Sequence, residues 1–338
     1  KTRKNFQEES VLVKRKILVT NVLPEEGLKG LYPDFEVIAP KDRAFTREEV
    51  LELIPECQGI IPAFFKVDKE IIDQGRNLKI ISNYGAGFDN VDIAYATEKG
   101  IMVTNIPETV TQATAELALG LMISLMRRIT ETDRLVRKDS YEHWGTTISF
   151  LGTSLEGKIL GIVGMGRIGM ATARLAQAFG MQVIYQKRKP YPPEVEKTLN
   201  IRYAPLEELL KEADVVSLHC PLTPETRHLL GEKEFKLMKP TAVVVNTARG
   251  PVIHEKALIE ALEKGEIKGA ALDVFEFEPK VSAELLKMDN VVLTPHIGSS
   301  TLETRTIMAQ ACVKHIQDFF AGKRPTHIVN PEVKLNLD

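Results

Sequence analysis

The sequence has few cysteines and no long apolar run. Its cysteines, Cys57, Cys220 and Cys312, are odd in number and widely spaced, and they form no CxxC pair and no Cys/His cluster. This spacing argues against a disulfide framework and against a zinc site, so we expect no bound metal and a reducing cytoplasm as the compartment. No apolar segment approaches the length of a membrane span. The N-terminal stretch KTRKNFQEESVLVKR carries charge without an apolar signal core, so we expect a polar tail there.

The chain also lacks an excess of charge of either sign. Lysine and arginine total 44, and aspartate and glutamate total 46, so net charge gives no reason to expect nucleic acid or a membrane as a partner. A length of 338 residues favours two domains and allows a large buried core. These features fit a soluble enzyme.

A glycine-rich motif is the most informative feature that the sequence does contain. Residues 157–169 read GKILGIVGMGRIG, in which an apolar strand, Ile159 to Val163, runs into Gly164-x-Gly166-x-x-Gly169. Gly164 permits a tight turn, Gly166 lets backbone N–H groups approach a pyrophosphate, and Gly169 lets the following helix pack closely on the strand. The helix N-terminus then supplies an anion site. The motif predicts dinucleotide binding; a purely structural glycine-rich turn is the alternative.

The residues after the next strand, Tyr185-Gln186-Lys187-Arg188-Lys189, indicate which nucleotide is bound. A cofactor without a 2′-phosphate usually meets an Asp or Glu here, which hydrogen-bonds the ribose diol. This stretch has no carboxylate, and Arg188 could bind a 2′-phosphate through two parallel N–H groups. The sequence therefore favours NADP(H), with NAD(H) still possible. A solvated basic loop is the alternative reading.

Short apolar segments alternate with helical patterns on both sides of the motif. Before it we expect strands at Lys16–Thr20, Phe35–Ile38, Gly59–Pro62, Leu78–Asn83 and Ile101–Thr104. The helices expected between them are Arg47–Ile54, Val67–Gln74 and Val91–Lys99. A long helix is then expected from Thr111 to about Lys138, because Leu117, Leu121, Leu125 and Ile129 lie one helical turn apart.

The alternation continues after the motif. Strands are expected at Gln182–Tyr185, Val215–Leu218, Ala242–Asn246, Gly269–Asp273 and Val291–Thr294. The helices expected between them are Ala171–Phe179, Leu206–Lys211, Lys233–Met238 and His254–Lys264. A final helix, Leu302 to Ala321, is long enough to return to the first domain. We therefore predict an α/β protein of two doubly wound parallel-sheet domains: a Rossmann cofactor domain, 108–301, inserted in a flavodoxin-like substrate domain, 1–107 and 302–338.

Several segments resemble one enzyme family in their order and spacing. The motif Gly164–Gly169 is followed by HCPLTPET (219–226), NTARG (246–250), LDVFEFEP (272–279) and TPHIGSST (294–301). Together they resemble the D-2-hydroxyacid dehydrogenases over about residues 16–334. Within that family, GMGRIGMA followed by YQKRK is most similar to glyoxylate/hydroxypyruvate reductases and 2-ketogluconate reductases. The resemblance implies reduction of a small 2-oxo acid, such as glyoxylate, hydroxypyruvate or 2-ketogluconate, by NAD(P)H to a D-2-hydroxy acid.

This chemistry needs an acid beside the carbonyl, because hydride transfer to a 2-oxo acid leaves an alkoxide that must be protonated. Histidine titrates in the suitable range. Among seven histidines, His296 follows the apolar strand Val291–Leu293, at the end of a strand where α/β proteins bind ligands. The family resemblance implies that His296 is this acid.

The resemblance assigns two further catalytic residues. Glu278 matches the carboxylate that pairs with the histidine and favours its charged form; Glu276, two residues earlier, is the competing candidate. Arg249 would bind the substrate carboxylate and polarise the carbonyl, unless it is an exposed loop arginine. Ala86 and Gly87, in the turn Asn83–Gly87, would offer backbone N–H groups to the substrate; a tight turn with positive φ is the alternative.

The resemblance also implies a set of cofactor-binding residues. His219, Cys220 and Pro221 would form a wall beside the adenosine half. Asp273 would lie near the nicotinamide carboxamide, with a helix-capping role as its rival. The whole expected set is Gly164, Gly166, Arg167, Ile168, Gly169, Gln186, Lys187, Arg188, His219, Cys220, Pro221, Thr226, Thr247, Ala248, Asp273 and Gly298.

Other readings and some details stay open. Oxidation of phosphoglycerate or formate is a second enzymatic reading, although formate-using relatives lack a glutamate–histidine pair. A nucleotide-sensing protein that resembles the corepressors related to this family is a non-enzymatic reading. Trp144 is expected at a dimer interface rather than at the substrate, and Phe64 and Phe65 in the core rather than at the substrate mouth. We expect a homodimer formed through the long apolar helix, and hinges near 105–111 and 299–302.

Overall fold

The computed structural model describes residues 14–138, 146 and 148–335. Trp144 and most of the expected N-terminal tail lie outside this part of the chain. The chain forms two compact units: the first runs to Thr109 and resumes at Leu302, and the second is Val110–Thr301. Within the described residues, no helix is both long enough and apolar enough to cross a membrane.

The first unit has a five-stranded parallel sheet in the order β2-β1-β3-β4-β5. Its strands are β1 (Arg15–Val19), β2 (Phe35–Ile38), β3 (Gly59–Ile61), β4 (Ile80–Ser82) and β5 (Met102–Thr104). Its helices are α1 (Glu25–Leu28), α2 (Arg47–Leu53), α3 (Lys69–Gln74), α4 (Ile93–Glu98) and α12 (Leu302–Phe320), with a 3₁₀ turn η1 (Ile54–Glu56). Strands β3, β4 and β5 are buried along their whole length, which is why their sequences are mostly apolar.

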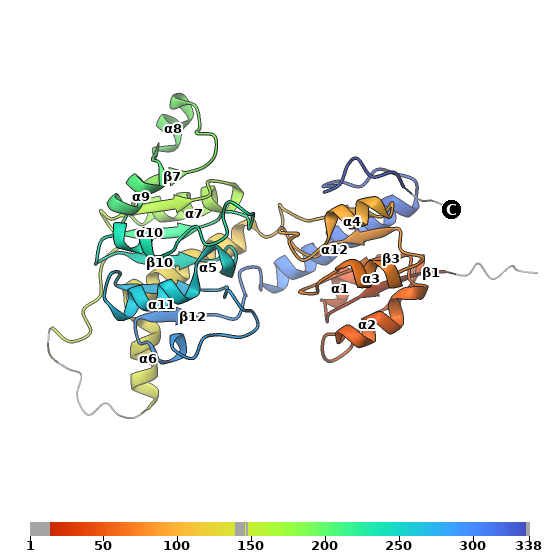
Figure 1. Cartoon of the computed structure of the whole chain (residues 1–338), viewed down its shortest axis with the longest axis horizontal. Coiled ribbons are helices and arrows are strands. Elements are labelled where there is room, and N and C mark those ends of the chain that lie inside the picture. The colour runs from red at the N-terminus through yellow and green to blue at the C-terminus, as the bar shows by residue number, and fades with distance from the viewer. Residues whose placement is uncertain (1–13, 139–145, 147, 336–338) are drawn as a thin grey trace, which may run out of the picture. The chain divides into compact units, whose positions relative to one another are not determined.

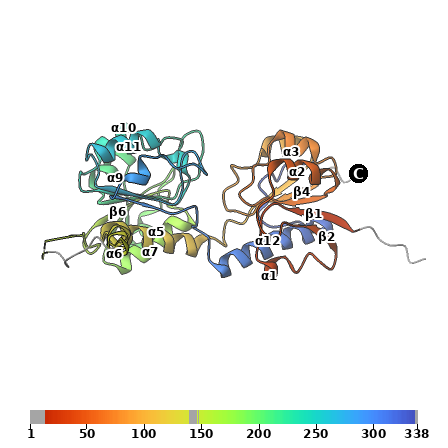
Figure 2. The same cartoon turned by 90° about the horizontal axis from the view of Figure 1, so that it is seen from below.

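The last helix of the chain completes this first sheet. Helix α12 packs against α1 and β4, and Figure 2 shows α1 and α12 on one face of the sheet with α2 and α3 on the other. Gly27 makes the packing of α1 possible, because a Cβ there would lie 2.5 Å from the Cβ of Ala309. The predicted return of the final helix to the first sheet is therefore what the structure shows (Figure 1).

The second unit has a seven-stranded parallel sheet in the order β12-β11-β10-β9-β6-β7-β8. Its strands are β6 (Ile159–Val163), β7 (Gln182–Gln186), β8 (Ile201–Tyr203), β9 (Val215–Leu218), β10 (Val243–Asn246), β11 (Gly269–Leu272) and β12 (Val291–Leu293). Its helices are α5 (Thr111–Met126), α6 (Ile129–Arg137), α7 (Arg167–Ala178), α8 (Pro193–Leu199), α9 (Leu206–Glu212), α10 (Glu232–Leu237) and α11 (Glu255–Glu263), with 3₁₀ turns η2 (Gly250–Val252) and η3 (Leu285–Lys287). Helices α5 and α7 cover one face, and α9, α10 and α11 cover the other (Figure 2).

The structure differs from the sequence prediction at one expected helix and at three elements that were not expected. The single helix expected from Thr111 to about Lys138 is wrong, because Arg128 adopts a left-handed conformation with φ of 56° and divides it into α5 and α6. The end of α5 is capped from far along the chain, since the Thr153 N–H donates to the Met126 carbonyl at 2.8 Å. Helices α1 and α8 and strand β8 were not predicted; α1 and β8 are only four and three residues long, and α8 starts at a proline.

Candidate active site

The glycine-rich turn joins β6 to α7 as the motif requires. Gly164 has φ of +98°, which disfavours other residues, and a Cβ on Gly169 would lie 2.5 Å from the Gly164 carbonyl oxygen. A Cβ on Gly166 would instead meet no atom within 4 Å, so there is open space in front of this residue. Helix α7 begins at the next residue without a side-chain cap, which leaves its first N–H groups available to an anion.

The loop after β7 is tied to this turn. The Gly164 N–H donates to the Gln186 carbonyl at 3.0 Å, and the Tyr191 hydroxyl donates to the Met165 carbonyl at 3.2 Å. The ammonium nitrogen of Lys187 lies 3.7 Å from the centre of the Tyr191 ring, a cation–π contact. Arg188 is exposed in the same loop. The basic residues therefore stand beside the turn at which a nucleotide would be held.

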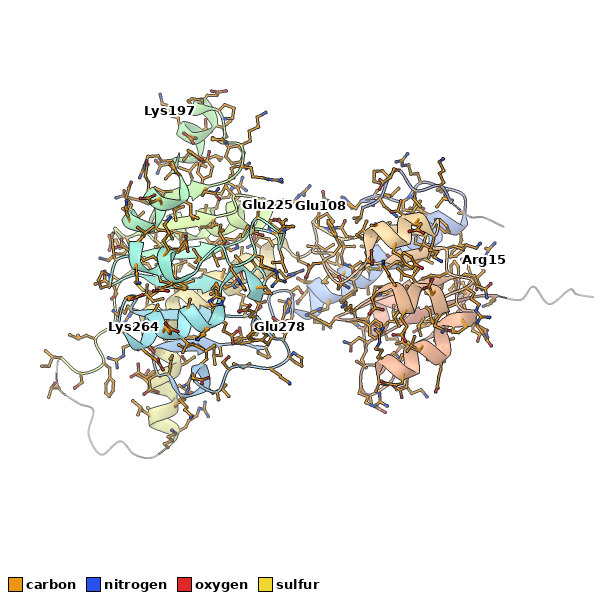
Figure 3. All side chains as sticks on the ribbon, in the orientation of Figure 1. Arg15, Glu108, Lys197, Glu225, Lys264 and Glu278 are labelled. Carbon is orange, nitrogen blue, oxygen red and sulfur yellow. The ribbon has the colours of Figure 1, made fainter. Side chains whose placement is uncertain are left out.

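Arg188 also acts on an acidic side chain of a neighbouring loop. The Thr223 hydroxyl, the Glu225 N–H and the Arg188 charge together hold the pKa of Glu225 below its ordinary value. Figure 3 labels Glu225 among the side chains of the second unit.

The segment 219–221 lies against the same turn. A Cβ on Gly164 would come within 2.5 Å of the Cys220 backbone nitrogen, and the His219 N–H donates to the Val163 carbonyl at 2.8 Å. The His219 ring is buried, which lowers its pKa to about 4, so it is neutral at pH 7. Its Nε2 shares a hydrogen bond of 2.8 Å with Ser217 Oγ, whereas Nδ1 is buried without a partner among the residues that the structure describes. Burial also raises the pKa of the Cys220 thiol to about 11.

A second buried polar atom at this edge, Thr247 Oγ1 just after β10, also has no partner within the described part of the chain. Buried polar groups without partners are rare in folded proteins and call for a specific explanation. Together with the open space at Gly166, these atoms fit a bound dinucleotide. The residues present are thus compatible with the cofactor that the motif predicts. Thr226 is farther along, where its hydroxyl donates to the Pro221 carbonyl at 2.6 Å.

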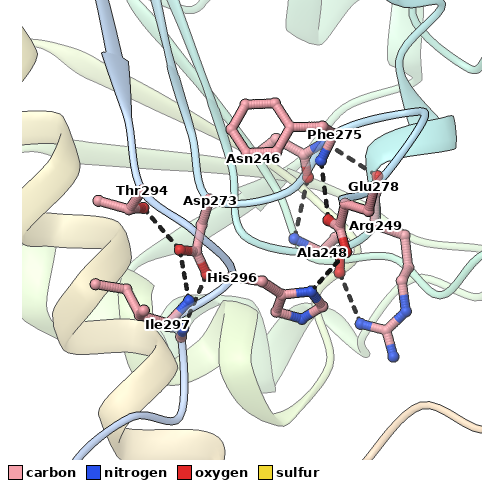
Figure 4. Close-up of polar contacts among 10 residues, drawn as sticks. Asn246, Ala248, Arg249, Asp273, Phe275, Glu278, Thr294, His296 and Ile297 are labelled. Atoms are coloured by element: carbon pink, nitrogen blue, oxygen red, sulfur yellow. Dashed lines mark hydrogen bonds and ion pairs between the residues drawn. The ribbon is translucent and has the colours of Figure 1, made fainter. Parts of the chain in front are cut away.

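Glu278 and His296 are brought together by the loops after β11 and β12 (Figure 4). Glu278 Oε2 lies 2.9 Å from His296 Nδ1, and Glu278 Oε1 accepts the Phe275 N–H at 2.9 Å. Burial alone would raise the pKa of Glu278, but the hydrogen bond to His296 and the charges of His296 and Arg249 together lower it. Glu278 is therefore a carboxylate at neutral pH, and its negative charge faces the His296 ring. Of the two candidate glutamates, it is Glu278 that contacts His296.

Arg249 lies on the neighbouring loop, which follows β10. Asn246, the last residue of β10, closes this loop: its side-chain amide donates to the Arg249 carbonyl at 3.0 Å and accepts from the Ala248 N–H at 3.0 Å. Arg249 Nη1 donates to the Ala248 carbonyl at 2.8 Å. The sequence analysis did not select Asn246. Its position at a strand end before a turn is the signal that could have identified it.

Asp273 supports the turn that carries His296. Its Oδ1 accepts from the Ile297 N–H at 2.8 Å and from the Thr294 hydroxyl at 2.6 Å. Its Oδ2 accepts from the Gly298 N–H at 2.8 Å. Burial raises the pKa of Asp273, and these donors oppose that rise. Asp273 thus holds a loop rather than the helix end that was considered in the sequence analysis.

Ala86 and Gly87 belong to the first unit. Their carbonyls are taken by two asparagine side chains, Asn105 to Ala86 and Asn83 to Gly87, both at 2.7 Å. Neither Gly85 nor Gly87 has a positive φ, so the alternative explanation of these glycines by backbone conformation is wrong.

The two phenylalanines of the first unit differ from each other. Phe65 packs against the core as expected. Phe64 is 61% exposed and lies against the Arg305 guanidinium, so its predicted core position is wrong.

Comparison with known proteins gives a consistent result. Residues 119–298 match the family described as D-isomer specific 2-hydroxyacid dehydrogenase, NAD binding domain. A glyoxylate reductase from Thermococcus litoralis is 47% identical over 327 residues, which cover 95% of this chain and 98% of that protein.

Two solved structures are also similar along nearly the whole chain. A glyoxylate reductase from Paecilomyes thermophila has a TM-score of 0.83 at 35% identity, covering 95% of this chain and 99% of that one. An NADPH-dependent glyoxylate/hydroxypyruvate reductase from Sinorhizobium meliloti, in complex with NADP and malonate, has a TM-score of 0.83 at 30% identity, covering 96% and 99%.

Proposed function

This chain belongs to the D-isomer specific 2-hydroxyacid dehydrogenase family, and we propose that it is an NAD(P)-dependent reductase of small 2-oxo acids that forms D-2-hydroxy acids. Glyoxylate and hydroxypyruvate are the substrates we favour, with 2-ketogluconate as a further candidate. The relatives named as glyoxylate reductases support this choice.

The observation that carries the proposal is the pairing of Glu278 with His296 at 2.9 Å. The nicotinamide supplies the hydride when it is bound. His296 would give the proton that the resulting alkoxide needs, and Nε2 is the ring atom proposed to hold it, since Nδ1 faces Glu278. Arg249 would bind the substrate carboxylate and polarise the carbonyl oxygen. Ala86 and Gly87 are proposed to add backbone donors to the carboxylate.

We propose that the cofactor occupies the turn Gly164–Gly169 and that NADP(H) is preferred. The loop after β7 offers Lys187 and Arg188 where an NAD-specific protein usually has a carboxylate. The remaining members of the expected set, from Arg167 and Ile168 to Gly298, are proposed to line the dinucleotide. NAD(H) would still be accepted if these cations are fully solvated.

We further propose a homodimer that works in the cytoplasm. Helix α5 does not provide the expected dimer surface, because it uses its apolar residues inside the second unit, against α7 and β11. Exposed apolar residues in this region lie after α5 instead, and they include Ile129, Val136, Ile148 and Leu151. Light scattering that reports a monomer at micromolar concentration would contradict the dimer. All three cysteines are free and buried, which suits a reducing compartment.

The deciding experiment is a steady-state panel with purified protein. Glyoxylate, hydroxypyruvate, pyruvate, phosphohydroxypyruvate and 2-ketogluconate are each tested with NADPH and NADH, and oxidation of the reduced nicotinamide is followed by absorbance. We expect turnover of glyoxylate and hydroxypyruvate, faster with NADPH. A strong preference for phosphohydroxypyruvate would overturn the substrate assignment. Cofactor binding without any turnover would favour a nucleotide-sensing role.

A further inference from the structure

A second glutamate of the same loop makes a separate set of contacts beside the proposed reaction centre. The Glu276 side chain is only 9% exposed, and its Oε1 lies 2.5 Å from His228 Nε2. Its Oε2 accepts the Glu255 N–H at 2.9 Å. In return, Glu255 Oε2 accepts the Glu276 N–H at 2.9 Å, and Glu255 Oε1 accepts the Ser282 hydroxyl at 2.5 Å. All four carboxylate oxygens of this pair therefore have a partner.

These contacts join three loops that follow adjacent strands. His228 lies after β9, Glu255 begins α11 after β10, and Glu276 lies after β11. The strands β9, β10 and β11 are neighbours in the sheet, so their following loops emerge at one edge. The first two loops are also paired directly, because the His228 N–H donates to the Pro251 carbonyl at 2.8 Å. We call His228, Glu255 and Glu276 the loop clamp.

The loop clamp joins the loops at a cost in free energy. Glu255 is 3% exposed, and burying two carboxylates side by side costs free energy unless each is hydrogen-bonded or paired with a cation. Burial raises the pKa of Glu276, but the Glu255 N–H and His228 lower it to below its ordinary value, so it stays ionised. Apolar side chains would join the loops at lower cost. The carboxylates instead fix the relative positions of the loops, since each oxygen accepts a hydrogen bond from one donor at one place.

The backbone connects the loop clamp to the proposed catalytic residues. Phe275, whose N–H holds Glu278 Oε1, immediately precedes Glu276. Gly250 immediately follows Arg249, and a Cβ there would lie 1.8 Å from the Phe275 carbonyl oxygen, so the two loops touch at this point. Fixing the backbone at Glu276 therefore fixes both the donor that orients Glu278 and the surface against which the Arg249 loop rests.

We propose that Glu276, held by His228 and Glu255, is a positioning residue for the reduction: it sets the orientation of Glu278 toward His296 and the place of the Arg249 loop. This inference rests on the proposed function. Displacement of reacting groups by about 1 Å can cost on the order of 100-fold in rate, so loss of the loop clamp should appear in kcat.

The test compares Glu276→Ala, Glu276→Gln and His228→Ala with the wild type. Glu263→Gln is the matched control, because Glu263 is an exposed glutamate on the same helix as Glu255. For glyoxylate and NADPH we expect Glu276→Ala to lower kcat about 10- to 100-fold with little change in KM for NADPH. Glu276→Gln should recover most of the rate, because its amide oxygen can still accept the Glu255 N–H and its NH₂ can donate to His228. Glu263→Gln should behave as the wild type.

A pH profile separates positioning from mere stability. If Glu278 turns away from His296, the protonated ring loses its facing charge, and the pH at which kcat falls should move to lower values in Glu276→Ala and His228→Ala. The His228 side chain is 37% exposed, against 9% for Glu276, so His228→Ala is expected to fold even if Glu276→Ala does not.

Variants with wild-type kcat would overturn the inference. So would variants whose loss of rate equals their loss of folded protein and whose pH profile is unshifted. Both outcomes leave the proposed function standing. A wild type that reduces no 2-oxo acid would remove the proposed function and the inference together.

Discussion

Replacing Glu278 by Gln should slow the reduction by about one to two orders of magnitude in kcat. In the wild type, Glu278 Oε1 accepts the Phe275 N–H at 2.9 Å. The substitution keeps the shape of the side chain and an oxygen that can still accept this N–H. It removes the negative charge and places an NH₂ group beside His296 Nδ1. That group donates to the ring nitrogen, so the neutral ring is favoured over the charged acid that the reaction needs.

The magnitude follows from the contact. A hydrogen bond to a charged group contributes about 1.5–3 kcal/mol, and each 1.4 kcal/mol is a factor of ten. Because the Glu278 side chain is 35% exposed, solvent screens the charge, and the lower end of this range applies to the electrostatic part. The disfavoured protonation state adds to it, as it does in other histidine–carboxylate pairs.

The assay is initial-rate kinetics with glyoxylate and NADPH across pH. The KM for NADPH should change little, since Glu278 is not among the residues proposed to bind the dinucleotide. Glu284→Gln, an exposed glutamate six residues farther along the same loop, is the control. If Glu278→Gln keeps a kcat within about threefold of the wild type across the pH range, the pair does not supply the acid, and the reasoning is refuted.

Three further predictions test the other groups. Arg249→Lys should lower kcat/KM for glyoxylate by about 10- to 100-fold, because a point charge does not replace a planar fork; an effect confined to the KM for NADPH would contradict it. Neutralising Lys187 and Arg188 together should raise the KM for NADPH at least about tenfold and leave that for NADH nearly unchanged, with the difference shrinking in added salt; equal effects on both cofactors would show that these cations are only solvated. Burial lowers the pKa of His315 to about 4 from 6.5, so the unfolded state binds more protons between these values and stability falls as pH drops through that window, by up to about 3 kcal/mol. His315→Gln should flatten the decline of Tm measured from pH 6.5 to 4, and parallel curves for the two proteins would exclude this cause.

The alternation of strands and helices could be predicted from the sequence, because buried parallel strands are continuous apolar runs. Strands β2, β6 and β9 begin and end at the predicted residues, and the other predicted strands differ by one or two residues at one or both ends. The break at Arg128 could not be predicted in this way, because no Gly or Pro stands there. At this point the Thr153 N–H, from 27 residues later in the chain, donates to the carbonyl at the end of α5.

The candidate site was readable in part. His296 and Arg249 both follow strand ends, and a parallel sheet gathers such residues at one edge. Their catalytic roles were nevertheless assigned through the family resemblance. The choice between Glu276 and Glu278 could not rest on spacing, because two residues in an irregular loop have no fixed faces. It is made by the hydrogen bonds: the Phe275 N–H takes Glu278, whereas the Glu255 N–H takes Glu276.

The acidic residues at this edge accept hydrogen bonds from loop backbone that the sheet and helices leave without acceptors. Loop backbone beyond a strand end has no sheet or helix partner for its N–H groups, and such groups need an acceptor when they are buried. Here carboxylates provide it for Glu255, Phe275, Glu276, Ile297 and Gly298. Each carboxylate thereby has a fixed orientation. It remains charged where its hydrogen-bond donors lower its pKa more than burial raises it. Glu278 uses only one oxygen for this purpose. Its second oxygen faces His296, so the same bond that completes the loop also aims a negative charge at the proposed acid.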